Sequence, residues 1–300
     1  MYESFNSLIP RRKVKKNYIL ISLTTIFFIT TILFLFLYLN LRSKIKLYIP
    51  DPKIYIPIKE PFNKNKIEGG QQFQGKHDIL NTPYYSRIDF YNKKSSGSFM
   101  ILEKFKTYQQ TSEYTCGCAS LIMALYYIDE TIISEKDCAE KSDTGTNIKL
   151  NSHGTYGTYP IDLEKAIINY GFNTESNRNF TEENSPFRDE ISFIKYVKDA
   201  IKSKEPIIVL SNDWGGHYIN IIGYDSMGTE ELYIDDILIV ADSYDTSDHV
   251  NDGYVIWSLE RFYSLISIPY PYFESSQNRL QFIRVKRKNN RDKWFMNIFY

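Results

Sequence analysis

An uncharged and strongly apolar run near the N-terminus constrains this chain of 300 residues more than any other feature. The run extends from Tyr18 to Leu41 and follows a segment, residues 11–16, that is rich in arginine and lysine. About 20 apolar residues in a helix cross the ~30 Å hydrocarbon core of a bilayer. A run this long that is apolar on every face is rarely the buried helix of a soluble protein. We therefore expect a basic tail at residues 1–16 and a transmembrane signal anchor at residues 17–41.

A cleaved signal peptide is the alternative to an anchor, because a basic segment followed by an apolar one is typical of both. The run is long for a signal peptide, however, and no small-x-small cleavage site follows Leu41. Five arginine or lysine residues precede the run within residues 11–16, and three follow it within residues 42–46. Basic residues tend to remain in the cytosol. These features predict a single-pass membrane protein with a cytosolic N-terminus and an extracytoplasmic domain.

Three further segments complete the predicted organisation. Residues 42–97 contain several prolines, a Gly69-Gly70 pair and only short apolar pieces, which is typical of a stalk or linker, and some of these pieces are candidates to pack on the following domain. Residues 98–287 are enough for one sizeable core. Residues 288–300 form a tail that mixes charged and aromatic side chains.

Composition and motifs exclude several classes of function. The 36 basic residues balance 36 acidic ones, so the formal net charge is zero and no overall field attracts nucleic acid. No set of cysteines and histidines has the spacing of a zinc site, and no glycine-rich phosphate loop is present. We expect neither a metal nor another cofactor, and no nucleic-acid partner.

The order of the predicted elements in residues 98–287 is typical of the α+β class, with helices first and most of the sheet later. The segment that begins with CASLIMALYYI is apolar around nearly its whole circumference and predicts a central buried helix. The predicted helices cover residues 118–128, 134–142, 160–171 and 192–204. The predicted strands cover residues 99–105, 206–210, 217–225, 231–245, 253–258 and 279–285, in a mixed or antiparallel sheet.

Four residues have the types and order of a thiol acyl-transfer site. Cys116 stands at the start of the buried helix, where unpaired N–H groups and the helix dipole favour a thiolate. His217 opens one predicted strand and Asp242 lies near the end of the next, so an imidazole and a carboxylate are available to activate the thiol. Gln110, six residues before Cys116, has a side-chain amide that is suited to an oxyanion hole, at about 3–4 kcal/mol per donor.

The orienting carboxylate has three rivals in the sequence. Asp235, Asp236 and Asp245 lie close to Asp242 in the same segment, and the connection that follows the strand of His217 is long. The sequence favours Asp242 and leaves these alternatives open.

The flanks of the candidate site predict the walls of a substrate cleft. Tyr114 precedes the nucleophile, and Gly117 follows it without a side chain that would block a close approach. Trp214 and Gly216 lie just ahead of the histidine. We expect these four residues to line the cleft.

Taken together, Gln110, the Cys116-Gly117 pair, His217 in GGHYINIIGYD and Asp242 in ADSYD resemble papain-like cysteine peptidases. The resemblance extends over residues 99–262 and is closest to the group of peptidases that trim double-glycine leaders in bacteriocin exporters, with their stand-alone relatives. It implies a papain-like fold, with a helical half that carries the buried nucleophile helix and a sheet half that carries the histidine. It also implies a peptide or protein substrate.

One departure from the family pattern is a second thiol beside the nucleophile. Relatives commonly have proline or another small residue at the position of Cys118. A redox-sensitive site and a buried small hydrophobic residue are both compatible with this cysteine, and we favour the second. Spacing does not decide whether Cys118 and Cys138 form a disulfide.

The sequence therefore predicts a membrane-anchored cysteine peptidase. Two alternatives stay open: an amidase or transpeptidase that uses the same acyl-enzyme, and a catalytically silent peptide-binding domain with the same fold.

Overall fold

The computed structural model describes most of the chain, in eight stretches. These are residues 11–44, 52–64, 68–73, 88–181, 183–229, 233–246, 251–268 and 281–287. The chain divides into two compact units, Met1–Tyr48 and Ile49–Tyr300, which are described separately. The C-terminal tail predicted at residues 288–300 lies outside the described residues.

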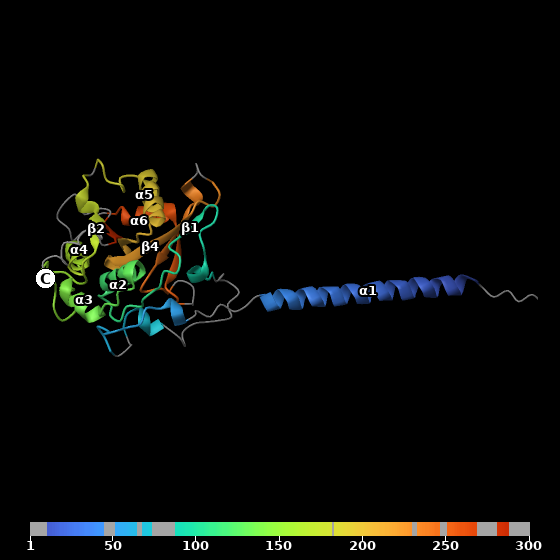
Figure 1. Cartoon of the computed structure of the whole chain (residues 1–300). Coiled ribbons are helices and arrows are strands. Elements are labelled where there is room, and N and C mark those ends of the chain that lie inside the picture. The colour runs from blue at the N-terminus through green and yellow to red at the C-terminus, as the bar shows by residue number, and fades with distance from the viewer. Residues whose placement is uncertain are drawn as a thin grey trace, which may run out of the picture. The chain divides into compact units, whose positions relative to one another are not determined.

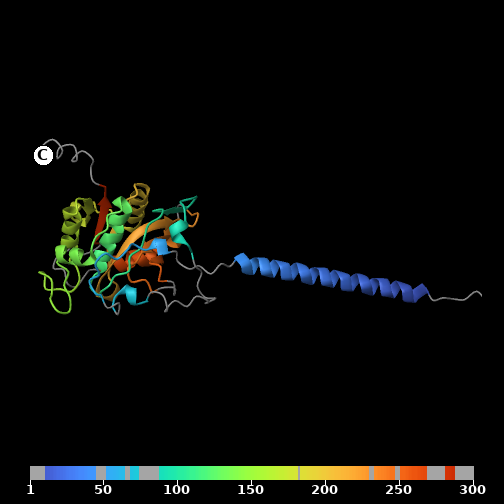
Figure 2. The same ribbon diagram turned by 60° about the horizontal axis from the view of Figure 1, so that its bottom comes forward.

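The first unit contains a single long helix, α1 (Arg11–Lys44), drawn in blue in Figures 1 and 2. Within the described part of the chain it is the one helix that is long and apolar enough to cross a membrane, over Ser22–Asn40. None of that stretch is buried against protein. A membrane anchor and a signal sequence both have these properties, since each needs a continuous apolar helix near the N-terminus.

The second unit is built around a seven-stranded sheet in which every strand pairing is antiparallel. The strand order is β2-β7-β3-β4-β5-β6, and β1 pairs with the far half of β4. The strands are β1 (Phe99–Ile101), β2 (Asn173–Ser176), β3 (Ile207–Ser211), β4 (His217–Asp225), β5 (Ile237–Ala241), β6 (Tyr254–Ser258) and β7 (Phe282–Lys286).

Helices pack against the sheet, and β4 lies at its centre. All residues of β4 except Asp225 are buried, as expected for a strand that is covered on both faces. Figure 1 shows α2 with α3 and α4 on one side of β4 and α5 with α6 on the other, and Figure 2 shows β7, in red, beside α2. The helices are α2 (Cys116–Asp129), α3 (Glu135–Lys141), α4 (Pro160–Asn169), α5 (Glu190–Lys202) and α6 (Leu259–Ile266).

Local sequence explains where these helices begin. The side chain of Ser134 accepts a hydrogen bond from the Asp137 N–H and so caps α3. Pro160 stands in the first turn of α4, where its missing N–H costs nothing. Helix α2 is apolar on all sides because it packs against the sheet and the neighbouring helices at once, as its buried residues from Cys116 to Leu125 show. The α+β class predicted from the sequence is confirmed, with a helical half that carries α2 and an antiparallel sheet half that carries β4.

Three details of the predicted elements differ from the structure. The strand predicted at residues 231–245 is limited to β5, because Tyr233–Asp235 form a short 3-10 helix before it. Strand β2 is short and polar, so it has no apolar alternation to reveal it. Helix α6 buries Leu259, Phe262 and Ile266 on one face, which is a helical spacing. It was not predicted, because this pattern covers only eight residues.

Part of the segment predicted as a linker packs with the domain, whose compact unit begins at Ile49. The side chains of Ile54 and Ile56 are 1% and 2% exposed and belong to the core. Their backbone pairs with Thr107, whose N–H donates to the Ile54 carbonyl at 2.9 Å and whose carbonyl accepts from the Ile56 N–H at 2.8 Å. Prolines around these residues limit regular strand formation and leave them as an isolated bridge.

The packing of Ile54 predicts a stability effect from outside residues 98–287. We expect Ile54→Ala to lower the free energy of unfolding by about 2–5 kcal/mol, because it leaves a cavity in the core. Ile148→Ala is the matched control, since Ile148 is 92% exposed and its truncation should change stability by less than about 0.5 kcal/mol. Denaturant unfolding of the full chain measures both. Equal effects of the two substitutions would contradict the packing described here.

Candidate active site

Helix α2 presents Cys116 at its N-terminal end. Thr115 is the N-cap residue, and its carbonyl accepts the first helical hydrogen bond from the Ala119 N–H at 2.9 Å. The N–H groups of the first turn therefore have no partner within the helix, and the helix dipole places partial positive charge beside the sulfur.

Two buried polar groups fix α2 to β4. The Ser120 hydroxyl donates to the Tyr218 carbonyl at 2.9 Å, and the Asn220 amide donates to the Ser120 carbonyl at 3.1 Å. Ser120 lies one helical turn after Cys116, and Tyr218 lies one residue after His217. The two hydrogen bonds therefore hold the thiol and the imidazole at the same end of the helix–strand contact.

The imidazole of His217 lies between the thiol and a carboxylate. Its Nε2 is 2.6 Å from Oδ1 of Asp242, and the ring also interacts with the Cys116 side chain. Asp242 directly follows β5, which pairs antiparallel with β4, so the end of one strand meets the start of the other. The Tyr244 N–H also donates to Asp242 Oδ1, at 2.8 Å, and holds the carboxylate in place.

The rival carboxylates have other partners. Asp236 is buried and accepts a hydrogen bond from the Tyr224 hydroxyl, and Asp235 accepts one from Thr229 Oγ1 at 2.7 Å. Asp245 accepts from the Gly253 N–H at 3.0 Å. The geometry thus favours Asp242 as the group that orients the imidazole.

Electrostatics favour a protonated His217. Burial alone lowers the pKa of this imidazole, but the charge of Asp242 and hydrogen bonds with Asp242 and Cys116 outweigh it and raise the pKa well above 6.5. A buried imidazolium is tolerated because a carboxylate lies in direct contact with it. Near neutral pH the ring therefore carries a proton that it can donate.

Gln110 is 1% exposed, and neighbouring groups fix the orientation of its side-chain amide. The Ser243 hydroxyl donates to Gln110 Oε1 at 2.7 Å, and Gln110 Nε2 donates to the Ser112 carbonyl at 2.7 Å. An amide NH₂ has two hydrogens. The second one makes no hydrogen bond within the described residues, so it can serve a ligand.

A buried carboxylate organises the loop that joins Gln110 to Cys116. Glu135, at the start of α3, is fully buried and accepts hydrogen bonds from four donors. These are Tyr108 Oη at 2.8 Å, the Thr111 N–H at 3.0 Å, Thr111 Oγ1 at 2.7 Å and Thr115 Oγ1 at 2.6 Å. Sequence reasoning missed this role, because an acidic residue in the first turn of a polar helix is ordinary.

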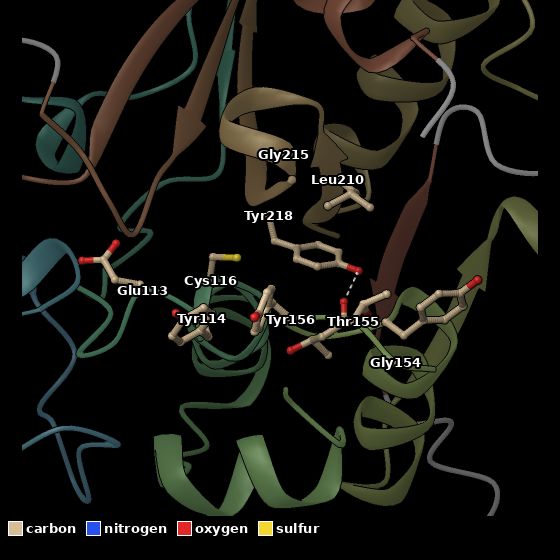
Figure 3. Close-up of a pocket in the computed structure, with 13 residues that line it drawn as sticks. Glu113, Tyr114, Cys116, Gly154, Thr155, Tyr156, Leu210, Gly215 and Tyr218 are labelled. Atoms are coloured by element: carbon tan, nitrogen blue, oxygen red, sulfur yellow. Dashed lines mark hydrogen bonds between the residues drawn. The ribbon is translucent and has the colours of Figure 1, made fainter. Parts of the chain in front are cut away.

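A cavity of about 450 Å³ opens beside Cys116 (Figure 3). Four tyrosine rings and Leu210 give it apolar surfaces, and glycines at two places allow a polypeptide backbone to approach closely. Figure 3 shows Cys116 between Glu113 on one side and Tyr156 and Leu210 on the other. The lining residues are Glu113, Tyr114, Cys116, Gly154, Thr155, Tyr156, Gly157, Thr158, Tyr159, Leu210, Gly215, Gly216 and Tyr218.

Of the residues predicted to form the cleft walls, Tyr114 and Gly216 line this cavity. Gly117 lies just behind the wall, where a Cβ atom would be 3.1 Å from Thr158 Cβ and 3.2 Å from Tyr218 Cδ2. The backbone of Trp214 belongs to the short 3-10 helix Asp213–Gly215, and its side chain lies outside the described residues.

Sequence reasoning missed Tyr156, Tyr159 and Leu210 as lining residues, because they come from a loop, a helix N-cap and a strand end that meet only in the folded chain.

The second and third thiols lie away from the cavity. Cys118 and Cys138 are fully buried and are not joined as a disulfide. Cys118 Sγ is also 3.5 Å from Ser142 Oγ. Cys118 thus behaves as a small buried side chain. Among the described residues, no group of three or more histidine, cysteine, aspartate or glutamate side chains has the arrangement of a metal site.

Comparison with known proteins identifies the family. The profile of the Peptidase_C39 like family matches residues 102–267, more than half of the chain, so the chain belongs to this family. The chain is similar to the peptidase domain of Streptococcus ComA, a bi-functional ABC transporter involved in a quorum sensing pathway, with 16% identity, a TM-score of 0.34, and coverage of 61% of this chain and 98% of that one. The peptidase domain of Streptococcus mutans ComA is similar at 16% identity and a TM-score of 0.29, with 60% and 98% coverage. No curated protein matches the chain.

The resemblance predicted from the sequence is therefore confirmed, and the chain is a relative of cysteine peptidases. The structure brings Cys116, His217 and Asp242 together. It also fixes the orientation of the Gln110 amide in the loop that leads to Cys116. The individual roles of these residues stay predictions.

The raised pKa of His217 predicts how stability depends on pH. The folded chain holds a proton that the unfolded chain releases above about pH 6.5, so the stabilisation is complete below that pH and is lost as the pH rises through the folded-state pKa. We compare Cys116→Ala with Cys116→Ala/His217→Gln, so that the thiol does not titrate while Asp242 remains. Denaturant unfolding between about pH 6 and about pH 10 should show the stability advantage of the histidine shrinking. A constant difference would contradict the raised pKa.

Proposed function

We propose that this chain is a membrane-anchored cysteine peptidase that hydrolyses peptide bonds through Cys116, His217, Asp242 and Gln110. The observation that carries the proposal is that His217 interacts with both Asp242 and Cys116, and that Cys116 lines a cavity. A thiol, an imidazole and a carboxylate in this order are the parts of a nucleophilic acyl-transfer site.

In the first half of the reaction, the Cys116 thiolate attacks the carbonyl carbon of the peptide bond. The negative charge moves to the carbonyl oxygen, where the second hydrogen of Gln110 Nε2 and the Cys116 N–H donate to it. The His217 imidazolium then gives its proton to the leaving nitrogen, the C–N bond breaks, and an acyl-enzyme and a free amine result.

In the second half, the neutral His217 takes a proton from water, whose oxygen attacks the thioester carbon. The C–S bond breaks, the carboxylic acid leaves, and the thiolate–imidazolium pair is restored. Asp242 keeps the imidazole in one orientation through both halves and stabilises its charged form.

The cavity supports a peptide substrate rather than a small polar amide. Its aromatic and aliphatic lining favours an apolar side chain, and Gly154 and Gly215, where a Cβ would meet no atom within 4 Å, leave room for an extended backbone. The same acyl-enzyme would serve a transpeptidase if an amine replaced water. Peptide assays with and without an added amine acceptor distinguish these outcomes, because only aminolysis gives a coupled product.

We expect the full chain in detergent to cleave members of a peptide library, with no activity in Cys116→Ala. Gln110→Ala should lower kcat by about 10²–10³-fold, because the oxyanion donor acts in the transition state. Alkylation of Cys116 near neutral pH, followed by mass spectrometry of its peptide, should be readily observed in the wild type, because the His217 imidazole interacts with the thiol. His217→Ala should abolish that reactivity.

Cys118→Ala is the matched control, because it removes a thiol two residues away that lies outside the cavity. It should retain both peptide cleavage and Cys116 reactivity. A folded wild-type chain that cleaves no peptide, and whose Cys116 alkylation is unchanged by His217→Ala, would contradict the proposal and indicate a peptide-binding domain.

We further propose that α1 stays attached as an anchor, with the N-terminus in the cytosol and the domain outside it. The length of α1 and the basic residues at its start support this orientation. In cells that express the chain with tags at both ends, both tags should stay in one membrane-bound product, and protease added outside should digest only the C-terminal one. Loss of the N-terminal tag together with release of the domain would indicate a cleaved signal peptide instead.

A further inference from the structure

A short segment from the predicted linker lies against the candidate active site. It consists of Gly69–Gln72, which we call the strap, and its last three residues begin the 3-10 helix Gly70–Phe73. Gly69, Gly70 and Gln71 are buried, although they come from a stretch with the composition of an exposed stalk. Burial of a backbone segment with no strand or long helix of its own requires specific partners for its polar groups.

The strap makes three hydrogen bonds to the loop that begins with Gln110. The Gly69 N–H donates to Glu113 Oε1 at 3.1 Å, the Gln71 N–H donates to the Gln110 carbonyl at 3.1 Å, and Gln71 Nε2 donates to the Thr111 carbonyl at 3.3 Å. The strap therefore holds the backbone of the residue whose side chain is the candidate oxyanion donor.

The strap also contacts the turn that follows β5. Gln72 Nε2 donates to the Tyr244 hydroxyl at 3.3 Å, and that hydroxyl donates to Glu113 at 3.1 Å. The same turn supplies Ser243, whose hydroxyl orients the Gln110 amide, and whose carbonyl accepts from the Gln110 N–H at 3.1 Å. One short segment thus joins the two loops on which the orientation of Gln110 depends.

Steric clashes with neighbouring backbone exclude any residue larger than glycine at the two glycine positions of the strap. A Cβ atom on Gly69 would lie 2.4 Å from the Gln110 carbonyl oxygen, and one on Gly70 would lie 2.1 Å from the Ser243 carbonyl oxygen. Both obstacles are backbone atoms, so a side chain at either position would displace the loop it touches. Any such displacement at Ser243 also moves the acceptor and donor that fix the Gln110 amide.

We infer that the strap is a positioning element of the catalytic site, which keeps the Gln110 amide aimed at the oxyanion. This inference rests on the proposed function, because it assigns the strap an effect on acyl transfer. The strap touches neither the thiol nor the imidazole in the contacts described above. Its effect should therefore fall on transition-state stabilisation and leave the reactivity of the Cys116–His217 pair unchanged.

The test compares Gly70→Ala with Gly228→Ala in the full chain. Gly228 lies in a turn where a Cβ would meet no atom within 4 Å, so this control introduces a side chain without a clash, although it adds the strain of a positive φ that Gly70 does not have. We expect Gly70→Ala to lower kcat about tenfold or more with little change in KM, since small misplacements of catalytic groups have effects of this size. The rate of Cys116 alkylation should change by less than about threefold, because alkylation needs no oxyanion hole.

A double-mutant cycle separates positioning from general destabilisation. If the strap acts through Gln110, adding Gly70→Ala to a Gln110→Ala chain should lower kcat much less than it does in the wild type. Gln71→Ala provides a second variant that introduces no clash and removes the bond to Thr111, and it should lower kcat in the same direction with the fold retained.

The outcomes are distinct for the two proposals. Loss of kcat in Gly70→Ala or Gln71→Ala that disappears in the Gln110→Ala background supports the strap. Suppose that the wild type is active but kcat in Gly70→Ala and Gln71→Ala is no lower than in Gly228→Ala, or that their effects on kcat add fully to that of Gln110→Ala. Either result overturns the strap inference and leaves the proposed peptidase function intact. A folded but inactive wild-type chain overturns the proposed function, and the strap inference with it.

Discussion

The contact between α2 and β4 is the constraint on which the candidate site depends. Ser120 and Asn220 are fully buried and far apart in sequence, and each side chain donates a hydrogen bond to a backbone carbonyl of the other element. Sliding the helix along the strand would break both hydrogen bonds, and an unpaired polar group in a core costs about 1–3 kcal/mol. Apolar packing alone would leave the position of α2 along β4 adjustable. The two hydrogen bonds fix that position, and with it the placement of Cys116 beside His217.

Two carboxylates near this contact have different consequences. Asp242 faces His217 and raises the pKa of its imidazole. Glu135 faces four hydroxyl and N–H donors and contacts none of the proposed reacting groups. A buried carboxylate is tolerated when several donors satisfy it, and it then rigidifies the groups that it joins. The loop between Gln110 and Cys116 is ordered by such a carboxylate rather than by regular secondary structure.

The sequence predicts the parts of this arrangement that local patterns encode. The all-round apolar character of α2 and the β-rich run of β4 identify the two central elements, and family motifs single out Cys116 and His217. The choice among four aspartates is different, since it depends on the register of β4 with β5 and on partners such as Tyr224. The roles of Glu135 and the strap were not predicted, because each makes its contacts with residues 20 or more positions away in the sequence. Neither stands out from its neighbouring residues in the sequence.

The packing of Ile54, Ile56 and the strap has a consequence for how this protein can evolve. In many tethered enzymes the spacer is a passive module that recombination can lengthen, shorten or replace without effect on the enzyme. Here the region that follows α1 supplies side chains to the core and hydrogen bonds to the candidate site. Exchange of this region for an unrelated sequence would remove part of the folded domain, so recombination at the start of the predicted catalytic segment would not leave the domain intact.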